Sequence, residues 1–203
     1  MMRDNYELQR QAAARTFLTY DIEKIAQTFG LALDETALYF PMLNTPHRLL
    51  RGTAQVERMQ DGAWTLAGFD AALTVYDLLT NPNGRPVLAH EWCAHTSFHA
   101  VQGGTVPGSL MIHPDESARP YEKDLGRLRR ACAHLGGREI TDGDFASVLP
   151  AFDCLPVLLR FWSADEEFPA QLQLLWDRNT CRYLRYETTF YLSGEILRRL
   201  REA

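Results

Sequence analysis

The chain has 203 residues, and 21 Lys plus Arg against 26 Asp plus Glu give a formal net charge of −5. With 46% hydrophobic and 23% charged residues, the composition is that of an ordinary globular protein and excludes disordered, collagen-like and coiled-coil chains. The negative charge, without a lysine-rich stretch, argues against nucleic acid or an anionic membrane as a partner.

The first third of the chain predicts a long helix followed by strands. Apolar residues recur at helical spacing from Leu8 to Phe29 and stop at Gly30, which predicts one amphipathic helix near residues 4–29. Three short apolar runs then predict the first strands of a sheet, the last of them before an Asp-Gly turn at 61–62. These runs are Ala37–Phe40, His47–Leu50 and Gln55–Met59.

The rest of the chain predicts three more helices and a strand pair. Helices are expected near residues 70–80, 120–135 and 188–202, and the second of them should close at Gly136-Gly137. Between the last two helices, the runs 156–162 and 171–176 predict antiparallel strands joined by an acidic loop. We therefore expect a single α+β domain over residues 1–203, with a mostly antiparallel sheet flanked by about four helices.

Cysteine usage and the N-terminus bear on the compartment. The four cysteines are scattered and form no CxxC pair, which favours a reducing environment. The first residues lack an apolar signal region, and no apolar run approaches the roughly 20 residues of a membrane span. These features predict a cytoplasmic protein.

Residues 90–99 concentrate the side chains that ligate metals. They hold three of the six histidines and one of the four cysteines, and imidazole and thiolate are ligands for zinc and later first-row metals. The zinc-protease motif HExxH is excluded, because His90 and His95 are five residues apart and about 500° of helical rotation separates them. A metal or metallocofactor held by His95, His99 and Cys93 remains a hypothesis.

Backbone type decides whether this hypothesis is feasible. In a helix, His95 and His99 would share one face and could hold a single ion. In a strand they would lie roughly 13 Å apart, and only Cys93 and His95 could converge. A further ligand would then have to come from His47 or His113.

Two other classes of function stay open. Cys93 could act as an enzyme's nucleophile, activated by His95 or His99, with the glycine loop 103–108 supplying backbone donors. Alternatively, Trp162 and Trp176 could form an exposed aromatic face for a protein partner. Buried cysteines and packed or surface histidines are the commonest roles of these residue types, so the sequence does not decide whether the protein is an enzyme.

Several runs of the chain resemble a known family. The runs 91–92, 97–104, 161–169 and 175–177 (EW, SFHAVQGG, FWSADEEFP and LWD) are similar to the uncharacterised bacterial and archaeal domain-of-unknown-function family numbered 3786. The resemblance covers most of the chain and implies a fold but no activity. In that family an Arg replaces His99 and the path from the Trp to the Ser-Phe pair is shorter, which places Cys93 and His95 in an insertion.

The resemblance also suggests which residues to test for a shared pocket. Some relatives carry a cysteine-rich iron–sulfur segment, but this chain has no CxxC pair to hold such a cluster. The leading hypothesis is a cytoplasmic ligand-binding or accessory protein with a pocket beside residues 90–104. The pocket candidates are Trp92, Ser97, Phe98, Gly103, Gly104, Glu166 and Glu167.

Overall fold

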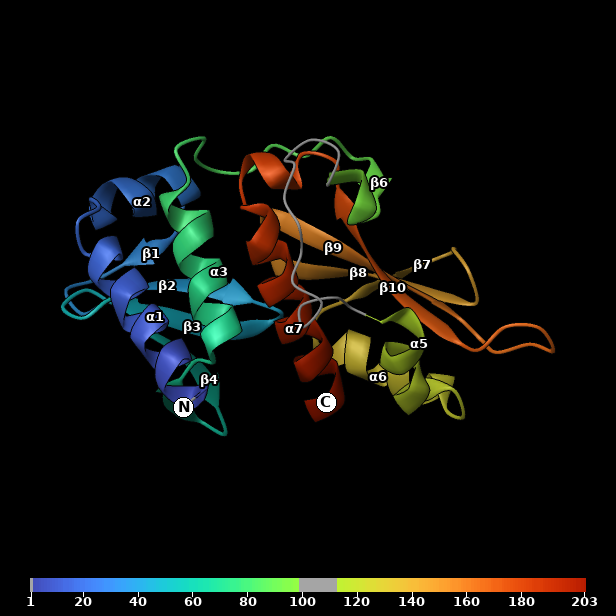
Figure 1. The fold of residues 1–203 in the computed structure, drawn as a ribbon. Coiled ribbons are helices and arrows are strands. Elements are labelled where there is room, and N and C mark those ends of the chain that lie inside the picture. The colour runs from blue at the N-terminus through green and yellow to red at the C-terminus, as the bar shows by residue number, and fades with distance from the viewer. Residues whose placement is uncertain (1, 99–112) are drawn as a thin grey trace.

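The computed structural model describes residues 2–98 and 113–203 of the chain (Figure 1). The fold is α+β, as predicted, but the strands form two five-stranded antiparallel sheets instead of one. The first sheet has the order β1-β2-β3-β4-β5 and the second the order β6-β10-β9-β8-β7. His99, Gly103 and Gly104, three of the predicted site residues, lie outside the described residues.

The first sheet is a meander of hairpins. Each strand pairs with the next along the chain, so only short connections are needed. The turn after β2 has positive φ at Leu43 and Asn44 (49° and 56°), and the turn after β4 has it at Asp61 and Gly62 (51° and 80°). Paired positive φ values match the right-handed twist of a tight hairpin. The strands are β1 Ala32–Leu33, β2 Ala37–Met42, β3 Thr45–Leu50, β4 Val56–Gln60 and β5 Ala63–Leu66.

The second sheet contains the predicted strand pair. In the antiparallel register of β9 and β10, Leu172 lies opposite Phe161 and Gln171 opposite Trp162, which confirms the expected pairing. Gln171 and Gln173 are half-buried whereas Leu172 is fully buried, so this part of β10 has one packed face. The strands are β6 Trp92–Cys93, β7 Arg138–Ile140, β8 Phe145–Phe152, β9 Leu155–Trp162 and β10 Gln171–Asp177.

Helix boundaries follow the capping residues. The helix expected over 4–29 is in fact two, because the Asp21 carboxylate accepts the Lys24 backbone N–H at 3.0 Å and starts a new helix there. Likewise, Asp124 caps the Arg127 backbone N–H at 2.9 Å, so the helix expected from 120 begins at Leu125. The helices are α1 Met2–Phe17, α2 Ile22–Phe29, α3 Phe69–Thr80, α5 Pro114–Ala118, α6 Leu125–His134 and α7 Tyr186–Glu202, with 3-10 turns at Arg119–Tyr121 and Thr180–Arg182.

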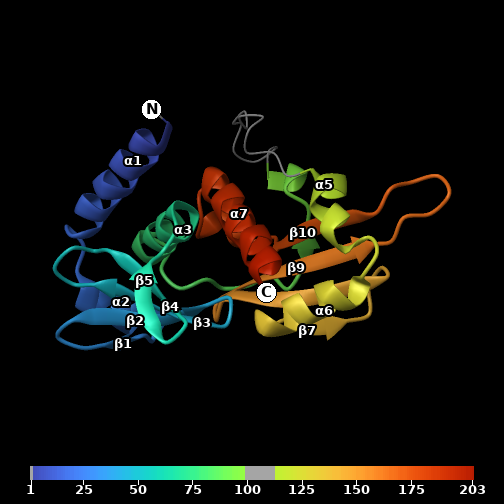
Figure 2. The same cartoon turned by 90° about the horizontal axis from the view of Figure 1, so that it is seen from below.

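Helix α7 joins the two sheets. It lies beside α3 and between the sheets, with α1 on the other side of α3 (Figures 1 and 2). Arg199 near its C-terminal end donates to the Thr45 hydroxyl of β3, and Glu202 lies 3.3 Å from the Arg58 guanidinium of β4. One cluster of buried side chains runs through both halves of the molecule and includes Leu38, Leu159 and Ile196.

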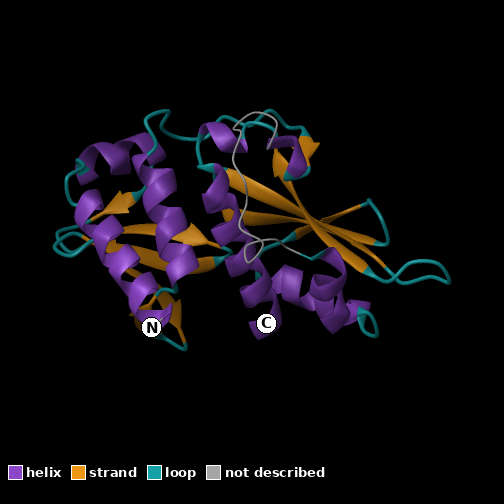
Figure 3. Cartoon of the chain, viewed as in Figure 1, coloured by secondary structure: helices purple, strands orange, loops and turns teal. Residues whose placement is uncertain are grey.

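Helices α1 and α3 and the β9–β10 hairpin lie at different ends of the molecule. Figure 3 shows that α1, α3 and α7 lie together, whereas the β9–β10 hairpin extends away from the helices at the opposite end. Among the described residues, no helix combines the length and the apolar character that a membrane span requires.

Candidate functional site

The histidine-rich segment is docked on β10 instead of forming an extended helix or strand. Trp92 and Cys93 pair with Asp177 and Trp176, and residues 96–98 are helical. The Asp177 carboxylate accepts the backbone N–H groups of Ala89 and His90 at 2.9 and 2.7 Å. Neither of the two backbone geometries considered from the sequence therefore applies to the whole segment.

His95 is a packed ring in an aromatic cluster. Its imidazole stacks on Phe190 of α7 at 4.4 Å between ring centroids and 12°, and lies 5.0 Å from the Trp176 ring. Burial lowers the pKa of His95 to about 4, so the ring is neutral at pH 7.

Hydrogen bonds on α7 define the tautomer of this neutral ring. The Thr189 hydroxyl donates its single hydrogen to the Tyr186 carbonyl at 2.6 Å. It must therefore accept from His95 Nε2, which lies 2.7 Å away. This tautomer leaves the lone pair on Nδ1. Helix α7 thus holds the orientation of the imidazole through stacking and one hydrogen bond.

The cysteines of this region hold their protons. Burial raises the pKa of the Cys93 thiol, and burial together with Cys93 raises the pKa of Cys181 to about 12. A nucleophilic cysteine normally has a lowered pKa, so the environment of Cys93 disfavours the enzyme hypothesis. No hydrogen bond between Cys93 and His95 is present in the described structure.

The additional metal ligands considered from the sequence are placed elsewhere. His47 belongs to the other sheet, where it is 1% exposed, stacks on Phe40 and donates from Nδ1 to the Thr45 carbonyl at 2.9 Å. His113 is exposed just before α5. Within residues 2–98 and 113–203, no group of three or more His, Cys, Asp or Glu side chains could hold a metal ion. Because His99 lies outside these residues, its part in a metal site stays a prediction.

The predicted pocket residues do not converge in the described structure. Phe98 is buried in the core at 4% exposure, while Ser97 is exposed. Glu166 and Glu167 are exposed at the tip of the β9–β10 hairpin, whereas Trp92 pairs at the other end of β10. The length of that strand separates them, which is roughly 20 Å at about 3.3 Å per residue.

One aromatic prediction needs correction. The proposed exposed face of Trp162 and Trp176 does not exist, because Trp176 is 0% exposed and lies against His95. Trp162 is half-buried, with the Arg160 guanidinium 5.3 Å from its ring centroid. Trp176 belongs to the segment of β10 that is covered on both sides, which the alternation at its start did not reveal.

A groove runs along α3 on the helical side of the molecule. Two hollows of 480 Å³ each lie beside α3 and adjoin at Tyr20 and Thr80. We call them together the α3 groove. The aromatic hollow, between α1, α3 and α7, is formed by Phe17, Tyr20, Tyr76, Asp77, Arg185 and Tyr191 among others. The lysine hollow, between α2 and the end of α3, is formed by Tyr20, Lys24, Ile25, Phe29, Leu79 and Gly84 among others.

The walls of the aromatic hollow are held by contacts on both sides. The Tyr76 hydroxyl donates to the Ala54 carbonyl at 2.7 Å, and its ring packs 5.6 Å from Phe17. Tyr191 meets Phe69 edge to face at 5.5 Å. At the N-terminus of α7, the Asp77 carboxylate accepts the backbone N–H of Arg185 at 2.7 Å and lies 3.2 Å from its Nε. These contacts hold the walls in place without filling the hollow.

The lysine hollow is bounded by the turn after α3. Asn81 accepts the backbone N–H of Asn83 at 2.9 Å, and Asn83 donates to the Arg182 carbonyl at 2.7 Å. Gly84 has φ +68°, and a Cβ there would lie 3.2 Å from Thr28, so glycine suits both the turn and the contact. Lys24 is the cation on the rim of this hollow.

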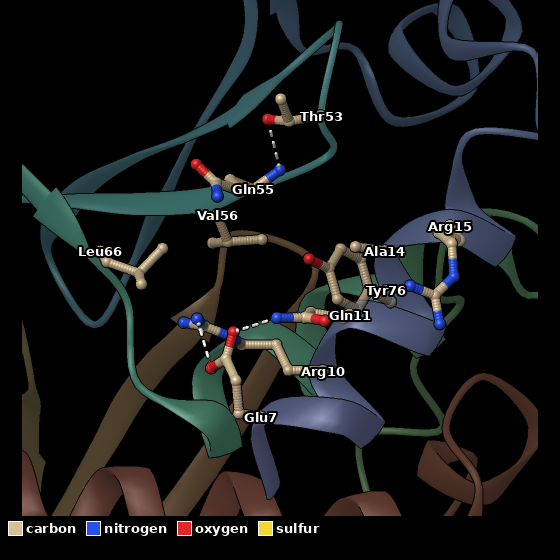
Figure 4. A pocket seen from close by; sticks show the side chains of 10 residues that line it. All are labelled: Glu7, Arg10, Gln11, Ala14, Arg15, Thr53, Gln55, Val56, Leu66 and Tyr76. Carbon is tan, nitrogen blue, oxygen red and sulfur yellow. Dashed lines mark hydrogen bonds and ion pairs between the residues drawn. The ribbon is translucent and has the colours of Figure 1, made fainter. Parts of the chain in front are cut away.

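A third, smaller hollow lies across α1 from the groove. It has a volume of 280 Å³ and shares Tyr76 with the aromatic hollow (Figure 4). The Glu7 carboxylate in this hollow already has hydrogen-bond partners, because Arg10 and Gln11 donate to its two oxygens at 2.6 and 2.9 Å. These bonds lower the pKa of Glu7. This hollow therefore has fewer polar groups available for a ligand than its lining suggests.

Helix α7 separates the groove from the histidine segment. At 100° per residue, Glu187, Thr188 and Tyr191 share the face that lines the groove. Tyr186, Thr189 and Phe190 lie on the opposite face and surround His95. The groove could not be predicted from the sequence, because Tyr20 and Tyr76 are ordinary residues of a helix or its flank. The turn at 81–84 was its one readable signal.

Comparisons with known proteins give one match. A family model described as a domain of unknown function (DUF3786) matches residues 21–199. No curated protein and no solved structure matches the chain. The matched range includes α2, α3 and most of α7, whereas α1, which supplies one wall of the aromatic hollow, precedes it.

Proposed function

The chain belongs to the DUF3786 family of domains of unknown function, and from this premise we propose that it is a binding protein for a small organic molecule. The ligand lies along α3, in the aromatic hollow and against the neighbouring lysine hollow. The observation that carries the proposal is a pair of adjoining 480 Å³ hollows beside α3.

The shape and lining of the α3 groove support this function. Small-molecule sites are concave, have volumes of roughly 300–1,000 Å³, and combine apolar or aromatic walls with a few polar groups. The groove has rings from Phe17, Tyr76 and Tyr191 and a charged pair at its rim, Asp77 with Arg185. It also lies where α1, α3 and α7 from different parts of the chain meet, a common location for ligand sites.

A transition metal or metallocofactor is a second hypothesis that the described residues do not favour. Of the three predicted ligands, His99 lies outside the described residues, and the ring of His95 stacks on Phe190 and lies 5.0 Å from the Trp176 ring. The Cys93 thiol is protonated because burial raises its pKa. We therefore place the ligand in the α3 groove.

Titration with a neutral aromatic probe, benzyl alcohol, tests the proposal by methyl-group NMR. For a probe of this size we expect a dissociation constant of about 1 mM, with saturable shifts of the Leu73 and Thr188 methyl groups. Absence of saturable shifts at these groups contradicts the proposed function.

Two neighbouring residues of α1 offer a matched pair of variants. Ala13 lines the aromatic hollow, whereas Ala14 lines the 280 Å³ hollow of Figure 4, and both are half-buried. Ala13→Trp should fill the groove and weaken probe binding at least tenfold, while Ala14→Trp should leave it unchanged. Equal effects of the two variants would place the probe elsewhere.

A further inference from the structure

We propose that the ligand of the α3 groove carries a positive charge, as an amine or quaternary ammonium group, and that this group sits in the aromatic hollow between Tyr76, Tyr191 and Asp77. The inference rests on the proposed function and adds the chemical class of the ligand and its orientation in the groove.

The charges that line the aromatic hollow are predominantly negative. Asp77 and Glu187 supply two carboxylates, and among the described residues Arg185 is the one basic side chain that lines it. Arg185 is 79% exposed and points its charge largely into solvent, whereas Asp77 is 11% exposed. A charge on a partly buried group is less screened by water than one at the surface. The interior of the hollow therefore favours a cation.

Glu187 adds an exposed and therefore more strongly screened negative charge to the lining, and Asp70 lies on α3 beside α7 without lining the hollow. Glu187 is exposed in the first turn of α7 and forms no ion pair among the residues the structure describes. Asp70 packs on α7, where a Cβ on Gly194 would lie 2.8 Å from its Oδ2. Burial, and after it the charges of Asp70 and Glu187, raises the pKa of Tyr191.

The aromatic rings add a second attraction for a cation. The faces of aromatic rings carry partial negative charge and attract ammonium groups within about 6 Å. Tyr76, Tyr191 and Phe17 all line the hollow, and Tyr20, 46% exposed, lies at its junction with the lysine hollow. An ammonium group between these rings would meet the Asp77 carboxylate at the same time.

The lysine hollow gives the ligand a direction. Its rim carries one charge of each sign, the Asp21 carboxylate and the Lys24 ammonium. Its walls include the apolar side chains of Ile25, Phe29 and Leu79. Because these two charges offset each other, this hollow gives a cation no net attraction, whereas an apolar segment would pack against its walls. The ligand should therefore place its charged group in the aromatic hollow and extend its apolar part past Tyr20 and Thr80.

Three probes of nearly equal size test the charge preference. Protonated benzylamine, benzyl alcohol and benzoate differ chiefly in carrying positive, zero or negative charge. At low ionic strength we expect benzylammonium to bind at least fivefold more tightly than benzyl alcohol, and benzoate to bind more weakly than either. The advantage of the cation should shrink in 0.5 M NaCl, because salt screens exposed charges.

Variants separate the contribution of the Glu187 carboxylate to cation binding from that of the Tyr191 ring. Glu187→Gln should reduce the advantage of benzylammonium about twofold or more while leaving benzyl alcohol binding unchanged. Glu166→Gln, at the exposed hairpin tip, is the matched control and should change neither the advantage of benzylammonium nor the binding of benzyl alcohol. Tyr191→Phe should retain benzylammonium binding, whereas Tyr191→Leu should weaken it about fivefold, because only the ring face attracts the cation.

The outcomes distinguish this inference from the proposed function. If benzyl alcohol binds in the groove but benzylammonium binds no better, the charge assignment is overturned and the binding function stands. If benzoate binds most tightly, the assignment is also overturned. If none of the three probes binds, the proposed function itself fails.

Discussion

The two faces of α7 differ in the residue types they contact and in the open space beside them. One face presents Tyr186, Thr189 and Phe190 to His95, in the segment with the highest density of metal-binding residue types. The other presents Glu187, Thr188 and Tyr191 to a hollow of 480 Å³. The first face is closed by packing and the second is open, so accessible space, more than residue type, identifies the candidate site.

The largest expected effect is on the closed face. Trp176 of β10 is fully buried and lies against His95, so Trp176→Ala should lower the free energy of unfolding by about 3–5 kcal/mol. At roughly 2–4 °C per kcal/mol for a chain of this size, the thermal midpoint should fall by about 10 °C. Calorimetry measures this loss, and the folded fraction should still bind benzyl alcohol. If the protein that remains folded no longer binds the probe, then packing on the closed face affects binding on the open face.

Substitutions of His95 test whether it acts as a packed ring. His95→Ala removes the stack on Phe190 and should cost about 2–3 kcal/mol of stability. His95→Phe keeps an aromatic ring and loses only the hydrogen bond to Thr189, so it should cost about 1 kcal/mol. Urea unfolding compares the two. Equal losses would mean that the polar role of the imidazole outweighs its packing.

The two sides of α7 should respond to pH in opposite directions. Burial and Glu195 raise the pKa of Asp70 to about 6, so the native state favours the protonated carboxyl. The stability from Asp70 is present below its unfolded pKa near 4 and is lost as the pH rises through 6. Burial lowers the pKa of His95 to about 4, so the stability from neutral His95 is present above about pH 6.5 and is lost as the pH falls through 4.

Difference measurements isolate each group. Relative to the wild type, Asp70→Asn should gain about 1 kcal/mol of stability between pH 4 and pH 7, after allowance for solvent screening. His95→Phe should show the opposite slope, because Phe has no proton to gain at low pH. Urea midpoints at several pH values supply both curves. Parallel slopes for the two variants would contradict the assigned shifts.

The smallest effect is expected at the rim of the groove. The guanidinium of Arg185 is mostly exposed, so Arg185→Ala should change the stability by less than about 0.5 kcal/mol. It should also leave the Asp77 carboxylate less neutralised and tighten benzylammonium binding about two- to threefold. Benzyl alcohol binding should not change, and weaker cation binding in this variant would contradict the charge assignment.

Local signals account for most of the fold that the sequence predicted. The Asp61-Gly62 turn, the β9–β10 pairing and the left-handed Gly136 at the end of α6 each depend on residues within one element or turn. The break at Asp21 was missed because the apolar period continues across it, and only the capping bond starts the second helix. The strands β5 and β8 were missed because Ala63–Leu66 is short and Pro150 interrupts Phe145–Phe152.

The candidate site was less predictable, because it depends on how distant elements meet. The sequence drew attention to His95 and Cys93 by residue type, but their burial comes from contacts with α7 and β10, more than 80 residues later in the chain. Tyr20, Tyr76 and Tyr191 gave no such signal, since each is an ordinary residue of a helix or its flank. Only the packing of α1, α3 and α7 brings them around one hollow.

Mapping where benzylammonium binds tests the central claim most directly. In an NMR titration of the full chain, the largest saturable shifts should fall on Ala13, Leu73 and Thr188, which line the aromatic hollow. The signals of Phe98 and the Trp176 indole, on the other side of α7, should change little. If the largest shifts appear at Phe98 and Trp176 instead, the ligand site belongs to the histidine segment and the account is wrong.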